Sequence, residues 1–388
     1  EAEADLYLSL PQSDWAAWLP KRSVGDWQLQ ALQAGGELWA RWERGGLARA
    51  AARLNAAHLV AGYQARASVV LDDLAADLYV DRQADGDYRL QAERLSFDLG
   101  EQRLAETRLV VQRGAASGDW ALRIDRLQVA PLAALAQALA PLPEAGLETL
   151  NALAPQGTLQ DVWVAFRPGR SDEERLRYSA RLDDIRIGDH HWIPAVEHAS
   201  GTVSGTQYQG QLRLDSRDFS LQLAPLFPEA WAYRQARGTL SWRLDEEALT
   251  LVGSALQLEG EEGRLAGDFL IRLRRDPAAE DYMDLRVGLS DGDARFAGKY
   301  LPSRSPALSP ALKDWLEQAI RGGTIEQGYF LYQGALNRGA PAEARSMGLY
   351  FKVHDAELAY RPGWPALRGG RGEVLIEDSG IRVRLAEG

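Results

Sequence analysis

The sequence predicts a mainly β fold: an elongated, twisted antiparallel sheet curled into a groove with an apolar interior, and a few short helices. Apolar and polar residues alternate through most of the 388 residues, so each expected strand has one apolar and one polar face. Short clusters rich in Gly, Asp or Glu separate the alternating segments, as is typical of hairpin turns. With 46% hydrophobic residues and 12 Trp, the chain has enough apolar surface for a sizeable interior.

The N-terminal half contains strand-like segments at residues 5–10, 26–31, 37–43, 68–80, 88–98, 102–112 and 120–129. An Ala-rich run at 47–57 has helix propensity. A loose repeat centred on Gly201, Gly238 and Gly372 indicates hairpins that each open at the glycine.

Three regions interrupt the alternation with helical patterns. A short helix is expected at 12–19, capped by Ser13, and a pair of helices at 132–139 and 144–153. The third is a helix at 310–321, with Ser309 as N-cap and an end at Gly322-Gly323. Its apolar face would form a flap of Leu312, Trp315, Leu316 and Ile320. We expect all these helices to plug the groove, or simply to cover an end or edge of the sheet.

In the C-terminal half the alternation predicts which side chains share a face, although not whether that face is the inner one. The residues expected to line the groove are Leu240, Trp242, Leu244, Leu249, Leu251, Leu256, Leu258, Phe269, Ile271, Leu273, Leu349, Phe351, Val353, Val374 and Ile376.

Acidic and glycine clusters are expected to form turns. We place hairpin turns at 245–247, 260–263, 290–293 and 377–380. Turns are also expected at Asp72-Asp73, Asp183-Asp184 and Asp291/Asp293, because an Asp side chain bonds its local backbone. The pattern divides the chain into a hairpin array at 1–126, a helical insertion at 127–157, a second array at 158–293 and a distinct segment at 294–388, together forming one continuous β body.

Several function classes are disfavoured. A net charge of −11 would repel a nucleic acid backbone. The chain has no Cys, no nucleophile elbow and no phosphate-binding loop, so we predict neither a catalytic residue nor a cofactor, and no enzyme activity. His190, His191 and His198 lie close in sequence without a clear carboxylate partner, so no metal site is predicted.

No membrane-spanning segment is expected within this sequence. The longest uncharged run, at 127–143, is short and interrupted by three prolines. The chain begins at Glu1 without a signal pattern, so we interpret it as an excised piece or a processed form.

Periodicity alone leaves two interpretations of the apolar faces open. They would fill the dry core of a sandwich or closed barrel, or they would face each other across a lipid-filled furrow.

The segment from Phe296 to Trp364 resembles a known family. It reads Lys299-Tyr300-Leu301-Pro302, then the helix starting at Pro310, then Gly323-Thr324-Ile325-Glu326-Gln327-Gly328 and a strand, and closes on Tyr360-Arg361-Pro362-Gly363-Trp364-Pro365. This order is similar to the YhdP branch of the AsmA-like proteins of the bacterial envelope. The resemblance implies a non-enzymatic lipid conduit in the periplasm, carrying phospholipids between inner and outer membranes and anchored in the inner membrane by parts outside this chain. It also implies that the Ala-rich run 47–57 is a strand returning from a turn at 44–46.

Two rival functions remain open. A scaffold for outer-membrane proteins, like the related TamB proteins, would pair its sheet edge with client strands. A carbohydrate-binding β protein would need exposed Trp faces, for which the candidates are Trp15, Trp18, Trp163, Trp192, Trp231, Trp315 and Trp364.

Overall fold

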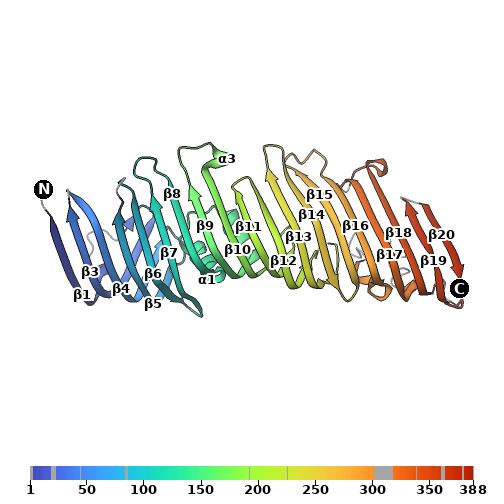
Figure 1. Ribbon diagram of the computed structural model, residues 1–388, viewed down its shortest axis with the longest axis horizontal. Coiled ribbons are helices and arrows are strands. Elements are labelled where there is room, and N and C mark those ends of the chain that lie inside the picture. The colour runs from blue at the N-terminus through green and yellow to red at the C-terminus, as the bar shows by residue number, and fades with distance from the viewer. Residues whose placement is uncertain are drawn as a thin grey trace. The chain divides into compact units, whose positions relative to one another are not determined.

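The computed structural model shows that most of the chain is folded into antiparallel strands (Figure 1). It describes residues 3–18, 23–43, 45–83, 86–191, 193–224, 226–300, 318–337, 339–359, 363–377 and 380–387. The chain forms two compact units, an N-terminal unit of residues 1–190 with 204–207 and a C-terminal unit of residues 191–203 with 208–388. The predicted division into four parts stays a prediction.

The N-terminal unit is a ladder of strands with helices on it. Its strands are β1 (Ala4–Asp14), β2 (Ser23–Val24), β3 (Trp27–Glu43), β4 (Gly46–Tyr63), β5 (Val69–Arg82), β6 (Tyr88–Leu99), β7 (Gln102–Arg113), β8 (Trp120–Gln128), β9 (Gln156–Phe166) and β10 (Leu176–Ile187). Its helices are η1 (Trp15–Ala17), α1 (Val129–Leu139), α2 (Glu144–Leu153) and α3 (Asp172–Arg175).

The C-terminal unit continues the same plan. It contains most of β11 (Ala195–Thr206), followed by β12 (Gln209–Gln222), β13 (Trp231–Leu244), β14 (Ala248–Gly260), β15 (Gly263–Arg274), β16 (Tyr282–Asp293), β17 (Ile320–Ala335), β18 (Arg345–Leu358), β19 (Leu367–Glu377) and β20 (Gly380–Glu387). Two short 3₁₀ turns, η2 (Ala294–Tyr300) and η3 (Ala342–Ala344), interrupt it.

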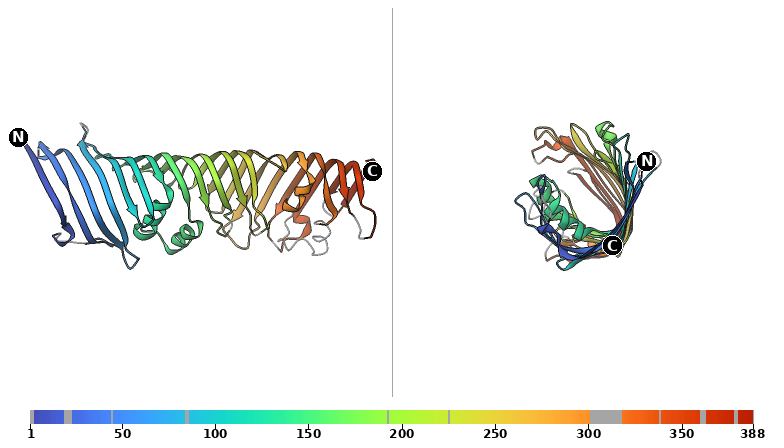
Figure 2. Two further views of the ribbon diagram at one scale, coloured as in Figure 1. Left: turned by 90° about the horizontal axis from the view of Figure 1, so that it is seen from below. Right: turned by 90° about the vertical axis from the view of Figure 1, so that its left-hand side faces the viewer.

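Within each unit, strands pair antiparallel with their neighbours along the chain, apart from the β1–β3 pair. The strands of each unit curve, and α1 lies inside the curve of the N-terminal unit (Figure 2). The predicted mainly β, antiparallel, groove-forming fold is therefore confirmed. The described strands of each unit form one layer, without the second sheet that a dry sandwich requires.

The Ala-rich segment is a strand, as the resemblance implied. It forms the first part of β4 and pairs with β3 from Glu43↔Gly46 onward. The two strands predicted at 26–31 and 37–43 are a single strand, β3.

The acidic pairs were wrongly placed in turns. Asp73, Asp184 and Asp291 lie inside β5, β10 and β16, with left-handed φ angles of 48°, 53° and 54°. Asp tolerates this conformation, and Asp73 and Asp184 each lie inside a register shift, so there the chain continues through a β-bulge instead of turning back. The same device occurs at Arg94 and Asp355, each inside a register shift. A bulge bends its strand, so these residues favour a curved sheet.

The repeat glycines lie within strands and do not open hairpins. Gly201, Gly238 and Gly372 are inside β11, β13 and β19. At Gly201, with φ of +155°, a Cβ would lie 2.0 Å from the carbonyl oxygen of Arg213, so glycine is required by the close approach of the neighbouring backbone. The other hairpin turns, at 245–247, 260–263 and 377–380, are confirmed by the strands they join.

The helix predictions were partly right. α1 and α2 confirm the pair at 132–139 and 144–153. Residues 12–14 instead belong to β1, and the cap of η1 is Asp14, whose Oδ1 accepts a hydrogen bond from Ala16 N at 3.1 Å. Most of the helix at 310–321 lies outside the described residues, but Ile320 is in β17, paired with Leu358, and Gly322-Gly323 continue that strand. None of the helices described is long and apolar enough to cross a membrane.

Candidate functional site

In the C-terminal unit, strand register gathers the fifteen predicted lining residues on one face of the sheet. One cross-strand row runs Trp242–Leu251–Ile271, and a second, from β17 to β19, runs Phe330–Leu349–Ile376. Directly paired residues of antiparallel strands point to the same side, so the rows form a continuous apolar face. All fifteen side chains are half-buried, none fully buried and none fully exposed.

Glycines on this face leave room for aromatic rings. A Cβ at Gly253 would lie 2.3 Å from the Phe269 ring, and one at Gly210 would lie 2.3 Å from the Trp242 ring. A Cβ at Gly328 would likewise lie 2.9 Å from the Phe351 ring. Each ring therefore lies over the glycine backbone of the neighbouring strand, so the rings form the apolar surface at these positions.

The opposite face of these strands carries ion pairs, beside apolar pairs such as Val252 with Leu270. Arg237 pairs with Asp215 at 3.0 Å, and Arg272 with Glu247 at 3.2 Å. Arg243 and Thr250 pair across β13 and β14, one position from the apolar residues Trp242 and Leu251. At these positions the sheet separates an apolar surface from a charged one.

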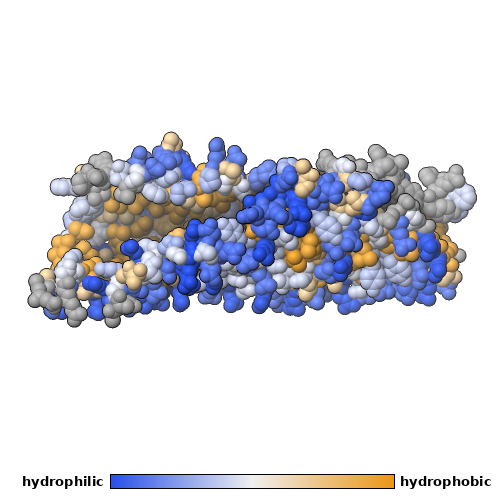
Figure 3. Space-filling view, turned by 90° about the horizontal axis from the view of Figure 1, so that it is seen from above, coloured by the Kyte–Doolittle hydropathy of each residue, from blue (hydrophilic) through white to orange (hydrophobic). Residues whose placement is uncertain are grey.

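The N-terminal unit has an equivalent apolar face, for which no lining residues had been named from the sequence. Its rows follow from register, and the row Leu78–Ala92–Leu109–Ile124–Val162 crosses β5 to β9. Figure 3 shows the face as an apolar hollow between two hydrophilic rims. The alternation of apolar and polar residues within 88–98 and 102–112 is the sequence signal that could have identified this face.

One end of this face is covered by α1. The helix packs Leu135, Ala138 and Leu139 against a cluster of buried side chains. That cluster is Val69, Leu71, Phe97, Leu104, Ile124 and Leu127. α1 therefore covers only the end of the face nearest these residues, which is one of the two roles expected of the helices.

The C-terminal end of α1 is held by polar contacts. Arg66 donates hydrogen bonds from its guanidinium to the carbonyl oxygens of Gln137 (3.3 Å), Ala140 (2.5 Å) and Leu142 (2.8 Å). The Trp27 indole donates to the carbonyl oxygen of Leu139 at 2.8 Å. These donors satisfy carbonyls that a helix end leaves without partners.

In the C-terminal unit, η2 is fixed by a buried polar cluster. Glu262, 5% exposed, accepts hydrogen bonds from Lys299 Nζ at 2.8 Å and from the Tyr300 hydroxyl at 2.7 Å. Because the Tyr300 hydroxyl donates its hydrogen bond to Glu262, Tyr233 is the donor in its 3.0 Å contact with Tyr300. The Trp231 indole donates to the Lys299 carbonyl oxygen at 3.3 Å.

The electrostatics of this cluster favour an ionised Glu262. Burial raises the pKa of the Glu262 carboxyl, but the hydrogen bonds from Lys299 and Tyr300 outweigh burial, so its pKa lies below the ordinary 4.5. Burial raises the pKa of the Tyr233 and Tyr300 phenols, which stay protonated. Lys299 and Tyr300 belong to the Lys-Tyr-Leu-Pro motif noted in the sequence.

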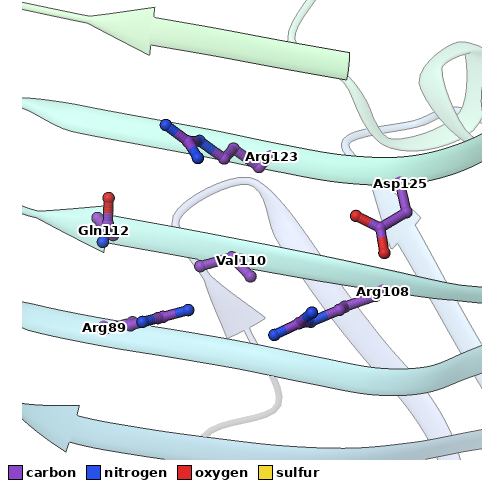
Figure 4. Close-up of a pocket in the computed structure, with 6 residues that line it drawn as sticks. All are labelled: Arg89, Arg108, Val110, Gln112, Arg123 and Asp125. Atoms are coloured by element: carbon purple, nitrogen blue, oxygen red, sulfur yellow. The ribbon is translucent and has the colours of Figure 1, made fainter. Parts of the chain in front are cut away.

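A pocket of about 330 Å³ lies on the polar face of β6, β7 and β8 (Figure 4). It is lined by Arg89, Arg108, Val110, Gln112, Arg123 and Asp125. Val110 pairs with Arg123 across β7 and β8, which places the pocket on the side away from Leu109 and Ile124. The pocket is therefore not part of the apolar face.

The remaining predicted candidates are dispersed. Three of the four proposed flap residues, Leu312, Trp315 and Leu316, lie outside the described residues, and so does Trp192. The fourth, Ile320, is in β17. Among the described Trp, Trp18 is 80% exposed and Trp364 57%. His190 and His191 follow β10 and His198 lies in β11, and the described residues contain no group of three or more His, Asp or Glu arranged to hold a metal ion.

Comparison with known proteins gives two matches. A sequence model described as YhdP protein matches residues 1–388. The intermembrane phospholipid transporter YhdP of Escherichia coli strain K12 is 25% identical over 239 residues, which are 58% of this chain and 18% of that transporter. The chain therefore aligns with less than a fifth of the length of that relative. No solved structure matches.

Proposed function

This chain belongs to the YhdP protein family, and we propose that its apolar faces bind the acyl chains of phospholipids as part of a non-enzymatic conduit. The conduit would run through the periplasm and carry lipid between the inner and outer membranes, to which parts outside this chain would connect it. The similarity to a phospholipid transporter supports the choice of lipid.

The observation that carries the proposal is the half-buried state of all fifteen lining side chains on a single-layer sheet. Large aliphatic and aromatic side chains left partly open in contiguous rows form a surface that favours an apolar ligand. In the C-terminal unit the opposite face carries ion pairs, so this unit has one side suited to acyl chains and one that holds charge in water.

The energetics fit this role. Moving a two-chain lipid with roughly thirty methylenes into water costs about 24 kcal/mol, at about 0.8 kcal/mol per methylene. An apolar face that continues from strand to strand offsets much of this cost at every position. Recognition then rests on apolar area and needs no pocket shaped to one molecule.

A photo-crosslinking amino acid at Leu251 tests the proposal, with Thr250 as its matched control. The two positions are adjacent on β14 and face opposite sides of the sheet. We expect mass spectrometry to detect phospholipid joined to position 251 and none at 250. Equal labelling at both positions, or none at 251 in a folded chain, would contradict the proposal and favour the scaffold alternative.

A charge placed on the apolar face gives a second readout. In Leu251→Glu, a carboxylate lies between Trp242 and Ile271, so acyl chains lose contact at that point. With a photo-crosslinking amino acid in place of Phe351, we expect the amount of crosslinked phospholipid to fall severalfold in this variant. It should stay unchanged in Thr250→Glu. Circular dichroism that still shows a folded sheet separates loss of binding from loss of structure.

A further inference from the structure

The open end of the N-terminal apolar face carries a row of aromatic and arginine side chains. Direct pairs join Arg82 to Tyr88, Tyr88 to Arg113, Arg113 to Trp120, and Trp120 to Phe166. These five residues, called the rim row, cross β5 to β9 at the strand ends farthest from α1. Each lies two residues beyond an apolar residue of the same face, as Trp120 lies beyond Leu122.

Exposure rises from the covered end of the face to the rim row. In the row containing Ile124, that residue is 8% exposed and Ala92 is 4%. In the rim row, Tyr88 is 38%, Phe166 41% and Trp120 44% exposed. The step between these rows spans four residues, or about 13 Å of strand. An apolar ligand on the face would therefore reach water at the rim row.

Both arginines of the rim row are available to an anion. Neither Arg82 nor Arg113 forms an ion pair with any residue that the structure describes, and both are exposed. The Arg113 guanidinium lies 5.3 Å from the centre of the Trp120 ring, which orients it without neutralising it. The nearby Asp87 carboxylate accepts a hydrogen bond from Ala115 N at 2.8 Å.

Aromatic rings beside arginines at the border of apolar surface and water suit one kind of ligand. In membrane proteins, Tyr and Trp rings are enriched at the membrane–water interface, where the acyl chains of lipids meet their polar headgroups. Arg binds phosphate through parallel N–H···O bonds. The apolar rows below the rim row would take acyl chains, so both parts of a phospholipid have a matching surface.

We propose that the rim row binds the phosphate of a phospholipid headgroup, with Arg82 and Arg113 contacting the phosphate while Tyr88, Trp120 and Phe166 contact the glycerol-ester region. This inference rests on the proposed function and specifies which lipids the N-terminal unit holds and in which orientation. The headgroup lies at the rim and the acyl chains point toward α1.

The test compares two lipids that differ only by the phosphate, phosphatidic acid and diacylglycerol with the same acyl chains. A photo-crosslinking amino acid at Leu122, one step below the rim row, reports which lipid occupies the face in equimolar mixed vesicles. The double variant R82Q/R113Q removes the rim charges. The matched control R89Q/R123Q removes two charges from the polar face of β6 and β8.

We expect the unmodified chain to capture phosphatidic acid about tenfold over diacylglycerol, corresponding to about 1.4 kcal/mol. The ratio should fall close to one in R82Q/R113Q, with diacylglycerol capture unchanged, and should persist in R89Q/R123Q. A ratio of one in the unmodified chain, or an equal fall in both variants, overturns the rim assignment and leaves the conduit proposal standing.

Two other outcomes are also decisive. Displacement of phosphatidic acid by millimolar inorganic phosphate would show an anion site that does not require lipid, and would overturn the assignment. Absence of both lipids at position 122 and of phospholipid at position 251 would overturn the conduit proposal itself.

Discussion

The two units hold a covering segment against the sheet by different means. α1 of the N-terminal unit is attached through apolar side chains, with Arg66 binding the carbonyls at its end. η2 of the C-terminal unit is attached through the buried ion pair of Lys299 and Glu262 with two tyrosines. Apolar contacts tolerate small shifts, whereas a buried ion pair is strongly destabilising when one partner is lost. A similar task, covering part of a sheet, therefore depends on packing in one unit and on charge in the other.

The largest effect is expected from Glu262→Gln. The amide oxygen still accepts a hydrogen bond from the Tyr300 hydroxyl but leaves the Lys299 ammonium, 15% exposed, without its counter-ion. We expect the C-terminal unit to lose about 3–5 kcal/mol of unfolding free energy, as typical for a broken buried pair. Urea denaturation measures the loss, and exposed Glu261→Gln is the control. Equal stability of the two variants would refute the polar attachment of η2.

The next effect is expected from Leu135→Ala on α1. The side chain is partly buried against the apolar cluster, so the loss should be about 2 kcal/mol, at the low end for such substitutions. Leu132→Ala on the same helix, 41% exposed, should change stability by less than about 0.5 kcal/mol. Hydrogen exchange of residues 129–139 reports the opening of the helix. Similar exchange in the two variants would mean that packing does not hold α1.

A smaller effect is expected from Arg66→Lys. Lysine keeps the positive charge but lacks the planar fork that reaches the carbonyls of Ala140 and Leu142 together. We expect a loss of about 1 kcal/mol, visible as faster exchange in the last turn of α1. If Arg66→Lys behaves as the unmodified chain, the charge alone accounts for the contact.

The smallest difference is expected from acidification. The pKa of Glu262 is lowered in the folded state, so its stabilisation is present above the ordinary value of 4.5 and is lost as pH falls below it, through the folded pKa. The contacts of α1 involve apolar side chains, an indole and a guanidinium, none of which titrates there. Below pH 4.5, hydrogen exchange should therefore accelerate at residues 294–300 relative to 129–139. Parallel acceleration in both segments would contradict the assigned role of the Glu262 carboxylate.

Much of the fold was predictable because period-two alternation needs only local sequence. Trp242, Leu251 and Ile271 were assigned to one face from spacing alone, and register places them side by side. That these residues bind lipid stays a proposal. The Ala-rich part of β4 was ambiguous by propensity, since pairing with β3 and β5 decides its structure.

The wrongly predicted turns share one physical cause. Asp and Gly adopt left-handed conformations both where a chain turns back and where a strand bulges, so Asp73, Asp184 and Gly238 carried the same local signal as a turn. The difference lies in whether neighbouring strands continue past the residue, which is a long-range property. The rim row was missed for the same reason, because Arg82 and Phe166 are brought into line only by the pairing of the strands between them.

The nearest-neighbour pairing within each unit has a consequence for how such proteins change in length. Among the residues that the structure describes, every strand from β12 to β20 pairs only with adjacent strands, and several carry their own bend-producing residue. Deleting or duplicating two consecutive strands would therefore preserve the direction of the chain and the face on which each side chain lies. The change would be confined to the place where the flanking strands meet new neighbours. Such a sheet can gain or lose hairpins through in-frame genetic events while its remaining surface stays in register.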